Sequence, residues 1–340
     1  MPHGYNQNET RGEHRMTTIF YTADADPTAI EGQRVAVVGY GNQGRSWSLN
    51  LRDSGVDVRV CVRADATRDA AEADGFATQD VDAANDADIQ CLLVPDDVIP
   101  SLPLQPGNEA LVIVASGFCP AFGRLELDCD VGMVAPRMLG PEVRRCYEEG
   151  VGFITAVGVH RDRTGTASAR TLAVANAIGG LRQGALSLTP HQEAVLDLAV
   201  EQALAPAMRR VSLSFVDVML GEGIPLEAIL TELFLSGEVE RSYRLMRLEG
   251  YAVQMEHHSP TSQYGQLSRS DRFDHVDVAT TMRDIVGNIA DGAFADEWEA
   301  EHEAGHPTLQ RLKAAAVGPD VIAFERDLRY RLGELAVEPH

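Results

Sequence analysis

The sequence predicts an α/β domain with a doubly wound parallel sheet, followed by a domain made only of helices. From Val35 to about Val159, short apolar runs alternate with helical stretches, and from Thr189 onward helical periodicity dominates. Alternation of this kind is typical of a parallel sheet covered by helices. We therefore expect residues 16–186 to form the α/β domain and residues 187–340 to form the helical domain.

Six apolar runs are the expected strands of the first domain. They have the length and the branched-residue content of buried parallel strands: RVAVVGY, VDVRVCV, DIQCLLVP, ALVIVAS, VGMVAP and GFITAVGV. Between them, GRSWSLNLRDSG and DATRDAAEADG have the pattern of helices that end at glycine.

The second domain is expected to contain only helices. Its periodic stretches are residues 190–209, 210–222, 226–250, 275–291, 293–304 and 319–335. Residues 1–15 are polar and carry no periodic pattern, so we expect a disordered extension that takes no part in the fold.

Composition excludes several classes of partner. The formal net charge of the 340 residues is −22, and Lys313 is the single lysine. Such a surface repels nucleic acid and anionic membranes. The five cysteines are scattered, and no apolar run has the ~18–20 residues that span a bilayer. Together with the lack of a signal-peptide pattern, these features predict structural thiols and a cytoplasmic location.

A glycine motif lies directly after the first strand. Gly39, Gly41 and Gly44 form G-x-G-x-x-G between that strand and the start of a helix. The first glycine permits a tight turn, the second lets the backbone approach a pyrophosphate, and the third lets helix and strand pack closely. The context favours a Rossmann-like dinucleotide site over a purely structural turn.

The loop after the second strand does not decide between the two nicotinamide cofactors. Arginines and hydroxyls accept the 2′-phosphate of NADP, whereas an acidic residue holds the ribose of NAD. The loop offers both kinds of residue: Arg63, Thr67 and Arg68 against Asp65 and Asp69. The choice between NADPH and NADH stays open.

Three carboxylates stand out in the helical half. Asp197 and Glu201 are four residues apart and so share one helix face, and Glu232 lies among apolar neighbours. Such oxygen ligands suit Mg²⁺, but in so acidic a chain a solvated face is the alternative. The adjacent His257 and His258 point apart on a helix, which favours a surface pair over a metal site.

Several longer segments resemble the ketol-acid reductoisomerases, also called acetohydroxy acid isomeroreductases. The resemblance runs from about residue 18 through VAVVGYGNQGRSWSLNLRDSGVDV, LLVPDD, MVAP, DLAVEQ, SPTSQYG and NIADGAFADEWEAEHEAGHP. It implies a Rossmann-like domain and a knotted helical domain of the family's shorter class. It also implies a homodimer that shares its active sites between chains. The family reaction is a Mg²⁺-dependent alkyl shift followed by reduction with NAD(P)H.

The resemblance assigns roles to individual positions. It places the metal ligands at Asp197, Glu201 and Glu232, with Glu232 coming from the partner chain, and it makes Ser259 a contact of the substrate carboxylate. The cofactor residues that it implies are Gly39, Tyr40, Gly41, Asn42, Gln43, Gly44, Arg63, Thr67, Arg68, Pro95 and Asp96.

The chain departs from the family pattern around the substrate and the metals. Ser236 stands where a fourth carboxylate is expected, Ser116 replaces a histidine, and Arg137 replaces a lysine. Met138, Leu139 and Pro141 follow in a segment that reads APRMLGP instead of APKGPGH. Scarcity of lysine accounts for Arg137, but scarcity does not account for Ser116, because the chain has ten histidines.

These departures favour a diverged NAD(P)H-dependent reductase of a small keto, 2-hydroxy-keto or imine substrate. The expected catalytic residues are Asp197, Glu201, Glu232, Arg137 and Ser116, with Ser259 and Ser236 binding substrate and the three carboxylates holding at most one Mg²⁺ well. Arg137 is always protonated and so serves as a carboxylate clamp rather than a proton donor. The alternatives are a genuine ketol-acid reductoisomerase and a non-catalytic cofactor-binding paralogue.

Overall fold

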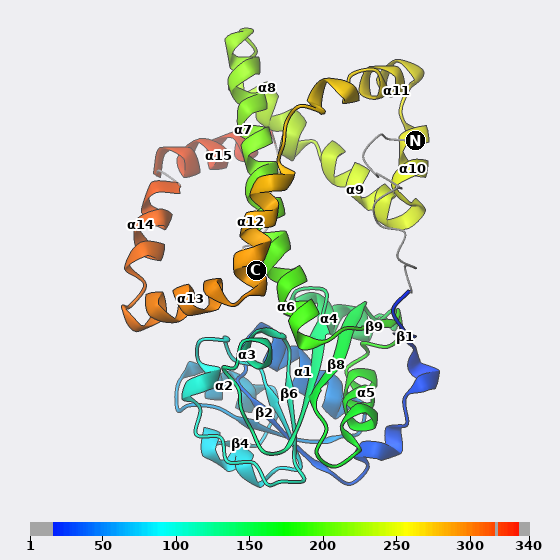
Figure 1. Cartoon of the computed structure of the whole chain (residues 1–340), viewed down its shortest axis with the longest axis vertical. Coiled ribbons are helices and arrows are strands. Elements are labelled where there is room, and N and C mark those ends of the chain that lie inside the picture. Colours follow the sequence, from blue (N-terminus) through cyan, green and yellow to red (C-terminus); the bar gives the residue numbers. More distant parts are fainter. Residues whose placement is uncertain (1–15, 317–318, 333–340) are drawn as a thin grey trace. The chain divides into compact units, whose positions relative to one another are not determined.

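The computed structural model describes residues 16–316 and 319–332 (Figure 1). It divides into two compact units. Of the described residues, the sheet unit contains those up to Leu198 together with Ile289–Ala295, and the helical unit contains Ala199–Asn288 together with those from Asp296 onward. The predicted extension, residues 1–15, lies outside the described residues.

The sheet unit is built on a nine-stranded sheet in which parallel pairs dominate. The strand order across the sheet is β1 (Ile19–Phe20), β9 (Ala185–Ser187), β8 (Thr155–Arg161), β7 (Asp130–Pro136), β6 (Leu111–Val114), β5 (Ile89–Leu92), β2 (Arg34–Val38), β3 (Asp57–Cys61) and β4 (Thr78–Gln79). Every pair from β7 to β4 is parallel, which confirms the predicted α/β fold.

The prediction of a parallel strand holds on only one side of GFITAVGV. That segment supplies β8, which runs antiparallel to β7 and parallel to β9, and β1 runs antiparallel to β9. A strand buried on both faces reads as an apolar run whichever way it points, so the pattern predicted burial and not direction.

Helices of the sheet unit bury its largest side chains against the sheet. Trp47 and Leu51 of α1 (Asn42–Asp53) are fully buried and pack with Val35 and Val37 of β2. The unit also contains α2 (Ala66–Ala73), α3 (Phe118–Ala121), α4 (Gly140–Glu148), α5 (Ala167–Ala177) and α6 (Pro190–Ala199). Short 3₁₀ turns are η1 (Thr22–Asp24), η2 (Pro27–Ile30), η3 (Val81–Asp86) and η4 (Ile99–Ser101).

The helical unit is all-helical, as predicted. Helix α6 passes through the π-helical turn η5 (Val200–Leu204) into α7 (Ala205–Gly221). The remaining elements are α8 (Leu226–Leu230), the π-helical turn η6 (Thr231–Leu235), α9 (Glu238–Glu249), α10 (Tyr251–Gln254), η7 (Met255–His257), α11 (Pro260–Leu267), η8 (Ser270–Phe273), α12 (Ala279–Ala290), α13 (Ala293–Glu303), α14 (Pro307–Ala316) and α15 (Pro319–Arg331).

Two helix predictions need correction. The expected continuous helix 226–250 is broken at Gly237, whose φ of +74° ends one helical segment before α9 begins. Helices α11 and α14 were not expected, since each is short and weakly periodic. None of the described helices is long and apolar enough to cross a membrane.

The helical unit leaves much of its apolar surface exposed. Helix α7 has no buried residue, and Val211 and Val218 are 66% and 63% exposed. Among described residues, the unit buries chiefly Ala203, Ile229, Gln254 and Leu328. Since burial of apolar surface supplies most of the stability of helices in proteins, these helices are only weakly stabilised by contacts within the described chain.

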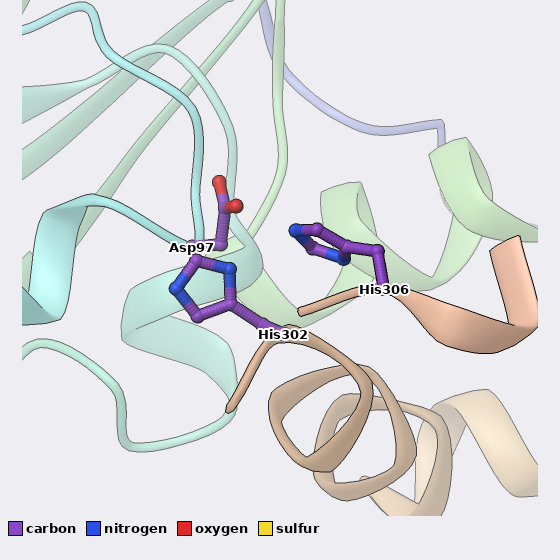
Figure 2. Close-up of side chains that lie close together, drawn as sticks. All are labelled: Asp97, His302 and His306. Atoms are coloured by element: carbon purple, nitrogen blue, oxygen red, sulfur yellow. The ribbon is translucent and has the colours of Figure 1, made fainter. Parts of the chain in front are cut away.

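The end of α13 is held by stacked aromatic rings. Trp298 stacks on His306 with ring centroids 5.2 Å apart, and His302 meets the same imidazole edge-on. Figure 2 draws the side chains of His302 and His306 at the end of this helix. The contacts are local to the helical unit and fix the turn that leads into α14.

Candidate functional site

The glycine turn occupies the place where an α/β sheet binds ligands. Strand β2 lies between β3 and β5, so the chain leaves the sheet at the point where the strand order changes direction. Gly39 has a φ of +96°, and a Cβ there would lie 2.5 Å from the Leu93 carbonyl oxygen. A Cβ on Gly44 would lie 2.3 Å from the Gly39 oxygen. Both glycines are therefore required for close packing.

Packing does not require glycine at Gly41, in contrast to Gly39 and Gly44. Gly41 is exposed at the N-terminus of α1, and a Cβ there would meet no atom within 4 Å. The protein itself does not fill this space, which leaves the backbone open to a phosphate at the helix N-terminus. A cavity of about 540 Å³ adjoins the turn and is lined by residues that include Gly39, Gly41, Arg63, Thr67 and Pro95. The residues present therefore fit a dinucleotide.

The two arginines after β3 have different surroundings. Arg68 donates to the Val62 carbonyl oxygen at 2.8 Å and forms an ion pair with Asp80. The Arg63 side chain is 86% exposed and lies 3.5 Å from Asp65. Asp65 in turn caps α2 by accepting the backbone N–H of Thr67 at 2.9 Å, and hydrogen bonds from the side chain and the backbone of Thr67 lower the pKa of Asp65. Of the two arginines, Arg63 is the one whose guanidinium is available to a ligand.

Several predicted cofactor residues use their side chains within the protein. The buried Tyr40 donates its hydroxyl to Asp74 at 2.8 Å. Gln43 donates to the Met138 carbonyl oxygen at 3.1 Å and accepts from the indole N–H of Trp47. Tyr40 therefore has little beyond its backbone to offer a ligand. Asn42 is exposed as the first residue of α1.

Asp96 lies half-buried after β5, next to a second anionic group. Burial raises the pKa of its carboxyl to about 6, and the negative charge of Glu193 adds to the effect. The Cys119 thiol donates to the backbone oxygen of Asp96 at 3.3 Å. Asp96 and Glu193 thus belong to one electrostatically coupled region of the sheet unit.

The loop after β7 is hydrogen-bonded to α1, the helix that begins at the glycine turn. Besides the bond from Gln43 to Met138, Ser46 donates its hydroxyl to the Gly140 carbonyl oxygen at 2.7 Å. A Cβ on Gly140 would lie 2.3 Å from the Asn42 oxygen, so loop and helix meet backbone to backbone. The start of α1 is therefore in direct contact with the segment that follows Arg137.

Arg137 joins two carboxylates of α6. Its guanidinium forms an ion pair with Glu193 and donates to the Asp197 carboxylate at 2.8 Å. Glu193 is 2% exposed, and its other oxygen accepts the Gly117 N–H at 2.7 Å. Burial raises the pKa of Glu193. We call Ser116, Gly117, Arg137, Glu193 and Asp197 the Arg137 cluster.

The Arg137 cluster unites three predicted residues and adds one that the sequence reasoning missed. Ser116, Arg137 and Asp197 were predicted, and Glu193 was not. Its signal was available, because Glu193, Asp197 and Glu201 are spaced by four residues and share one helix face. Ser116 accepts the Phe118 N–H at 3.1 Å, so its hydroxyl caps the short helix α3.

The other predicted site residues belong to the helical unit. Glu201 and Glu232 are exposed, and each lies in a π-helical turn, η5 and η6 respectively. Such turns are rare and often mark functional positions. The Ser236 hydroxyl contacts the Glu232 carbonyl oxygen and the Glu238 N–H, each at 3.3 Å. Ser259 caps α11 by accepting the Ser262 N–H.

His257 and His258 have separate partners. His257 forms a 2.6 Å contact with Glu249, and His258 forms one of the same length with Gln254. This arrangement agrees with the predicted surface pair. His191 contacts the Ala290 carbonyl oxygen at 2.9 Å and ties the returning segment Ile289–Ala295 to α6.

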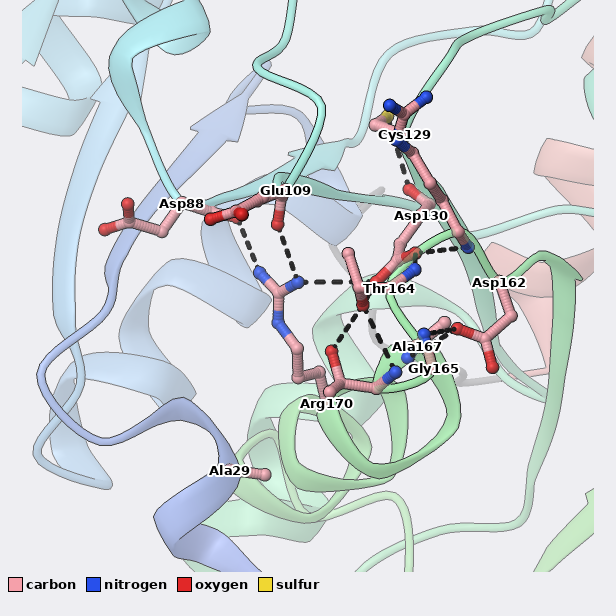
Figure 3. Close-up of polar contacts among 12 residues, drawn as sticks. Ala29, Asp88, Glu109, Cys129, Asp130, Asp162, Thr164, Gly165, Ala167 and Arg170 are labelled. Carbon is pink, nitrogen blue, oxygen red and sulfur yellow. Dashed lines mark hydrogen bonds and ion pairs between the residues drawn. The ribbon is translucent and has the colours of Figure 1, made fainter.

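A larger cavity, of about 850 Å³, lies at the opposite edge of the sheet. The hydrogen bonds made by the polar side chains around it have a structural role. Arg170 lines it and donates to the carbonyl oxygens of Asp88 and Glu109, which lie just before β5 and β6 (Figure 3). The fully buried Asp130 accepts the Arg163 and Thr164 N–H groups. These bonds satisfy buried backbone groups at the amino ends of the strands.

Comparison with known proteins decides the family. Residues 29–184 match the domain family described as acetohydroxy acid isomeroreductase, NADPH-binding domain, and residues 191–333 match ketol-acid reductoisomerase, C-terminal domain. The chain belongs to the ketol-acid reductoisomerase family. It is therefore an NAD(P)-dependent oxidoreductase, and the predicted family and enzyme class are confirmed.

Individual members of the ketol-acid reductoisomerase family match nearly the whole chain. The ketol-acid reductoisomerase (NADP⁺) of Saccharopolyspora erythraea is 36% identical over 87% of this chain and 92% of its own length. That of Caldivirga maquilingensis is also 36% identical, over 87% and 93%. The structure of an NADH-preferring ketol-acid reductoisomerase from an uncultured archean superposes with a TM-score of 0.84 at 26% identity, covering 94% of this chain and all of that one.

Proposed function

We propose that this protein is a diverged NAD(P)H-dependent reductase of a small keto, 2-hydroxy-keto or imine substrate. The observation that carries the proposal is the 2.8 Å bond from Arg137 to Asp197, the residue that matches the first metal ligand of the family. A carboxylate bound to a guanidinium is a poor ligand for a second cation. The alkyl shift of the family depends on two metal ions. Here Asp197 is bound to Arg137, and Ser236 stands where a fourth carboxylate is expected, so fewer carboxylates are available to hold two ions.

The residues present fit one Mg²⁺ better than two. Glu201 and Glu232 are exposed oxygen donors of the kind that Mg²⁺ prefers. Asp197 is bound to Arg137, and Ser236 offers a neutral hydroxyl that contacts the backbone oxygen of Glu232. Mg²⁺, when bound, polarises carbonyl and hydroxyl oxygens. The reduction itself asks only for an oriented carbonyl or imine group beside the cofactor.

The chain's own groups supply binding and orientation for a reduction. The turn from Gly39 to Gly44 seats the cofactor, which supplies hydride when bound. Arg137 donates hydrogen bonds without exchanging protons, and so it helps to orient a polar substrate and does not protonate it. Ser259 offers a hydroxyl to a substrate carboxylate, as the family resemblance implies.

Paired substrates test this proposal. The purified protein would be given 2-acetolactate and, separately, the already rearranged 3-hydroxy-2-keto acid, with NADPH or NADH and with or without Mg²⁺. We expect no Mg²⁺-dependent turnover of acetolactate, together with oxidation of NAD(P)H by the rearranged acid or by another member of a carbonyl and imine panel. Mg²⁺-dependent turnover of acetolactate would overturn the proposal.

A second candidate is a genuine ketol-acid reductoisomerase of branched-chain amino acid synthesis. It is favoured by the retention of Asp197, Glu201, Glu232 and Ser259 and by relatives that match nearly the whole chain. The same assay decides between the two candidates, because only the genuine enzyme converts acetolactate. Failure to bind either cofactor in a calorimetric titration would contradict both.

We also propose that the protein is a homodimer with active sites shared between chains. The exposed apolar side chains of α7, Val211, Phe215 and Val218 among them, support this assembly. A second copy would cover these side chains. The net charge of −22 argues against nucleic acid or an anionic membrane as the partner.

A further inference from the structure

We infer that Arg137 is a built-in cation that competes with divalent metal ions for Asp197. The inference deepens the proposed function, on which it rests, by naming the residue that weakens the metal site. Two nitrogen atoms of the guanidinium form ion pairs with two different carboxylates. These belong to Glu193 and Asp197, which lie on successive turns of α6. A metal ion that needs Asp197 must first displace it.

The guanidinium is anchored at its buried end. Glu193 is 2% exposed and accepts the Gly117 N–H as well as the guanidinium, so its charge is fully used inside the protein. Leaving that carboxylate without its cation would strand a buried charge, which is costly. Arg137 therefore stays with Glu193 whether or not Asp197 has another ligand.

The loop that carries Arg137 is also fixed. The backbone N–H of Arg137 donates to the Ile154 carbonyl oxygen at 2.9 Å, and the residues that follow are bound by Gln43 and Ser46 of α1. With both the backbone and the Glu193 end held, the second nitrogen remains close to Asp197. This proximity gives the intramolecular cation a high effective concentration compared with a dissolved metal ion.

The shape of arginine matters here. A guanidinium is a planar fork that reaches two carboxylates at once, whereas the ammonium of a lysine is a single point charge. Lysine at this position could neutralise Glu193 and leave Asp197 open. Asp197 has a half-exposed side chain, 49% accessible, so a dissolved cation can reach it once the guanidinium is gone.

The test is a titration of the full-length protein with Mn²⁺, followed by calorimetry and by electron paramagnetic resonance of free Mn²⁺. Arg137→Gln and Arg137→Lys are compared with the wild type, and Asp197→Asn is made in each background. We expect both Arg137 variants to bind Mn²⁺ about tenfold more tightly, since they release a charge-assisted hydrogen bond. Asp197→Asn should abolish that gain but leave wild-type affinity nearly unchanged.

A matched control comes from the same unit. Arg144 is 18% exposed and also bridges two carboxylates, Asp53 at 2.7 Å and Glu148 at 2.9 Å. Arg144→Gln should leave Mn²⁺ affinity unchanged. If Arg137→Gln fails to fold because Glu193 loses its counter-charge, Arg137→Lys decides the question, with thermal unfolding as the check on folding.

Two results would overturn the inference. One is unchanged Mn²⁺ affinity in the folded Arg137 variants. The other is a wild-type affinity that Asp197→Asn lowers as much as it lowers that of Arg137→Gln. Neither result depends on turnover, so metal binding tests this inference and turnover of acetolactate tests the reductase proposal, and the two failures are told apart.

Discussion

Asp96 follows β5 next to Pro95, close enough to Glu193 for the two carboxylates to repel each other. In the sequence, Asp96 stands out only because it lies in the LLVPDD segment of the family resemblance. Its raised pKa arises from burial and from the second anion, which lies 97 positions later in the chain. At the residue scale, the properties of a side chain in this protein depend on residues far away in the chain. In the same way, the guanidinium of Arg137 is held by its ion pair with Glu193.

The pH dependence of stability tests Asp96. Its carboxyl has a pKa of about 6 against an ordinary 3.8, so the folded state holds this proton more tightly than the unfolded state. That contribution is complete below the unfolded pKa and is lost as pH rises through the folded one. Asp96→Asn should therefore raise the free energy of unfolding by about 1–2 kcal/mol at slightly alkaline pH, with little effect near the unfolded pKa.

Urea unfolding across the acidic and neutral range measures this difference. Exposed Asp82→Asn is the control, for which we expect no dependence of that kind. Parallel stability curves for the wild type and Asp96→Asn would contradict the electrostatic account.

Arg63 carries a second prediction at the residue scale. Its side chain is 86% exposed beside the cofactor cavity, whereas Arg68 is bound to Val62 and Asp80. We expect Arg63→Ala to weaken NADPH about tenfold and NADH little, because only NADPH carries the 2′-phosphate. Isothermal titration with both cofactors measures this, with Arg59→Ala as the control. Equal losses for the two cofactors would show that Arg63 does not contact the 2′-phosphate.

At the scale of elements, the glycines of the G-x-G-x-x-G turn meet two different requirements, one for packing and one for binding. Gly39 and Gly44 are needed because backbone atoms of the protein occupy the space of their Cβ atoms. Gly41 borders open space at the N-terminus of α1. The motif therefore combines a folding requirement with a binding requirement, and the two respond differently to the same substitution.

Alanine at the two positions should separate those requirements. Gly44→Ala places a Cβ 2.3 Å from the Gly39 oxygen, so we expect it to lower the melting temperature and to weaken cofactor binding. Gly41→Ala should leave the melting temperature nearly unchanged and still weaken cofactor binding by at least about tenfold, because the methyl group enters the space of the phosphate. Unchanged affinity in Gly41→Ala would place the pyrophosphate elsewhere.

The π-helical turn η6 carries the other prediction at this scale. Ser236 follows Glu232 by four residues and stands where the family resemblance implies a carboxylate. Ser236→Glu should raise Mg²⁺ affinity about tenfold in a calorimetric titration, since a carboxylate replaces a neutral hydroxyl near Glu232. Glu240→Gln, which lies outside the turn, is the control. No change in affinity would count against this alignment of the metal site.

At the scale of the whole molecule, the two units differ in how they are stabilised. The sheet unit buries a continuous apolar core that contains Trp47, Ile89, Ile113 and Phe153. In the described part of the helical unit, buried side chains are few and α7 has none. A unit of that kind gains its stability from a further surface, and the proposed dimer supplies one.

Disrupting α7 should therefore change the assembly. We expect the wild type to sediment as a dimer, and Val218→Asp to shift it toward monomer because a charge enters an apolar contact surface. Val151→Asp, at a 50% exposed position of the sheet unit, is the control. Analytical ultracentrifugation measures both. A monomeric wild type would exclude an active site shared between chains.

Much of this protein was predictable from local sequence. The buried strands, the glycine turn and the helical second half each depend on residues near one another, so periodicity and turn chemistry were sufficient. Strand direction in β8 was not predictable, because an apolar run encodes burial alone. The break at Gly237 was also missed, since a single glycine in a periodic stretch does not by itself end a helix.

The sequence by itself determined the family, the cofactor turn and the identity of the altered residues, because all of these are properties of short segments read in order. Only the tertiary structure decided what the altered residues do. Arg137 reaches Glu193 and Asp197 across 56 and 60 positions of chain, and Glu193 reaches Gly117 across 76. Ion pairs form between groups that folding brings together, and their strength depends on burial.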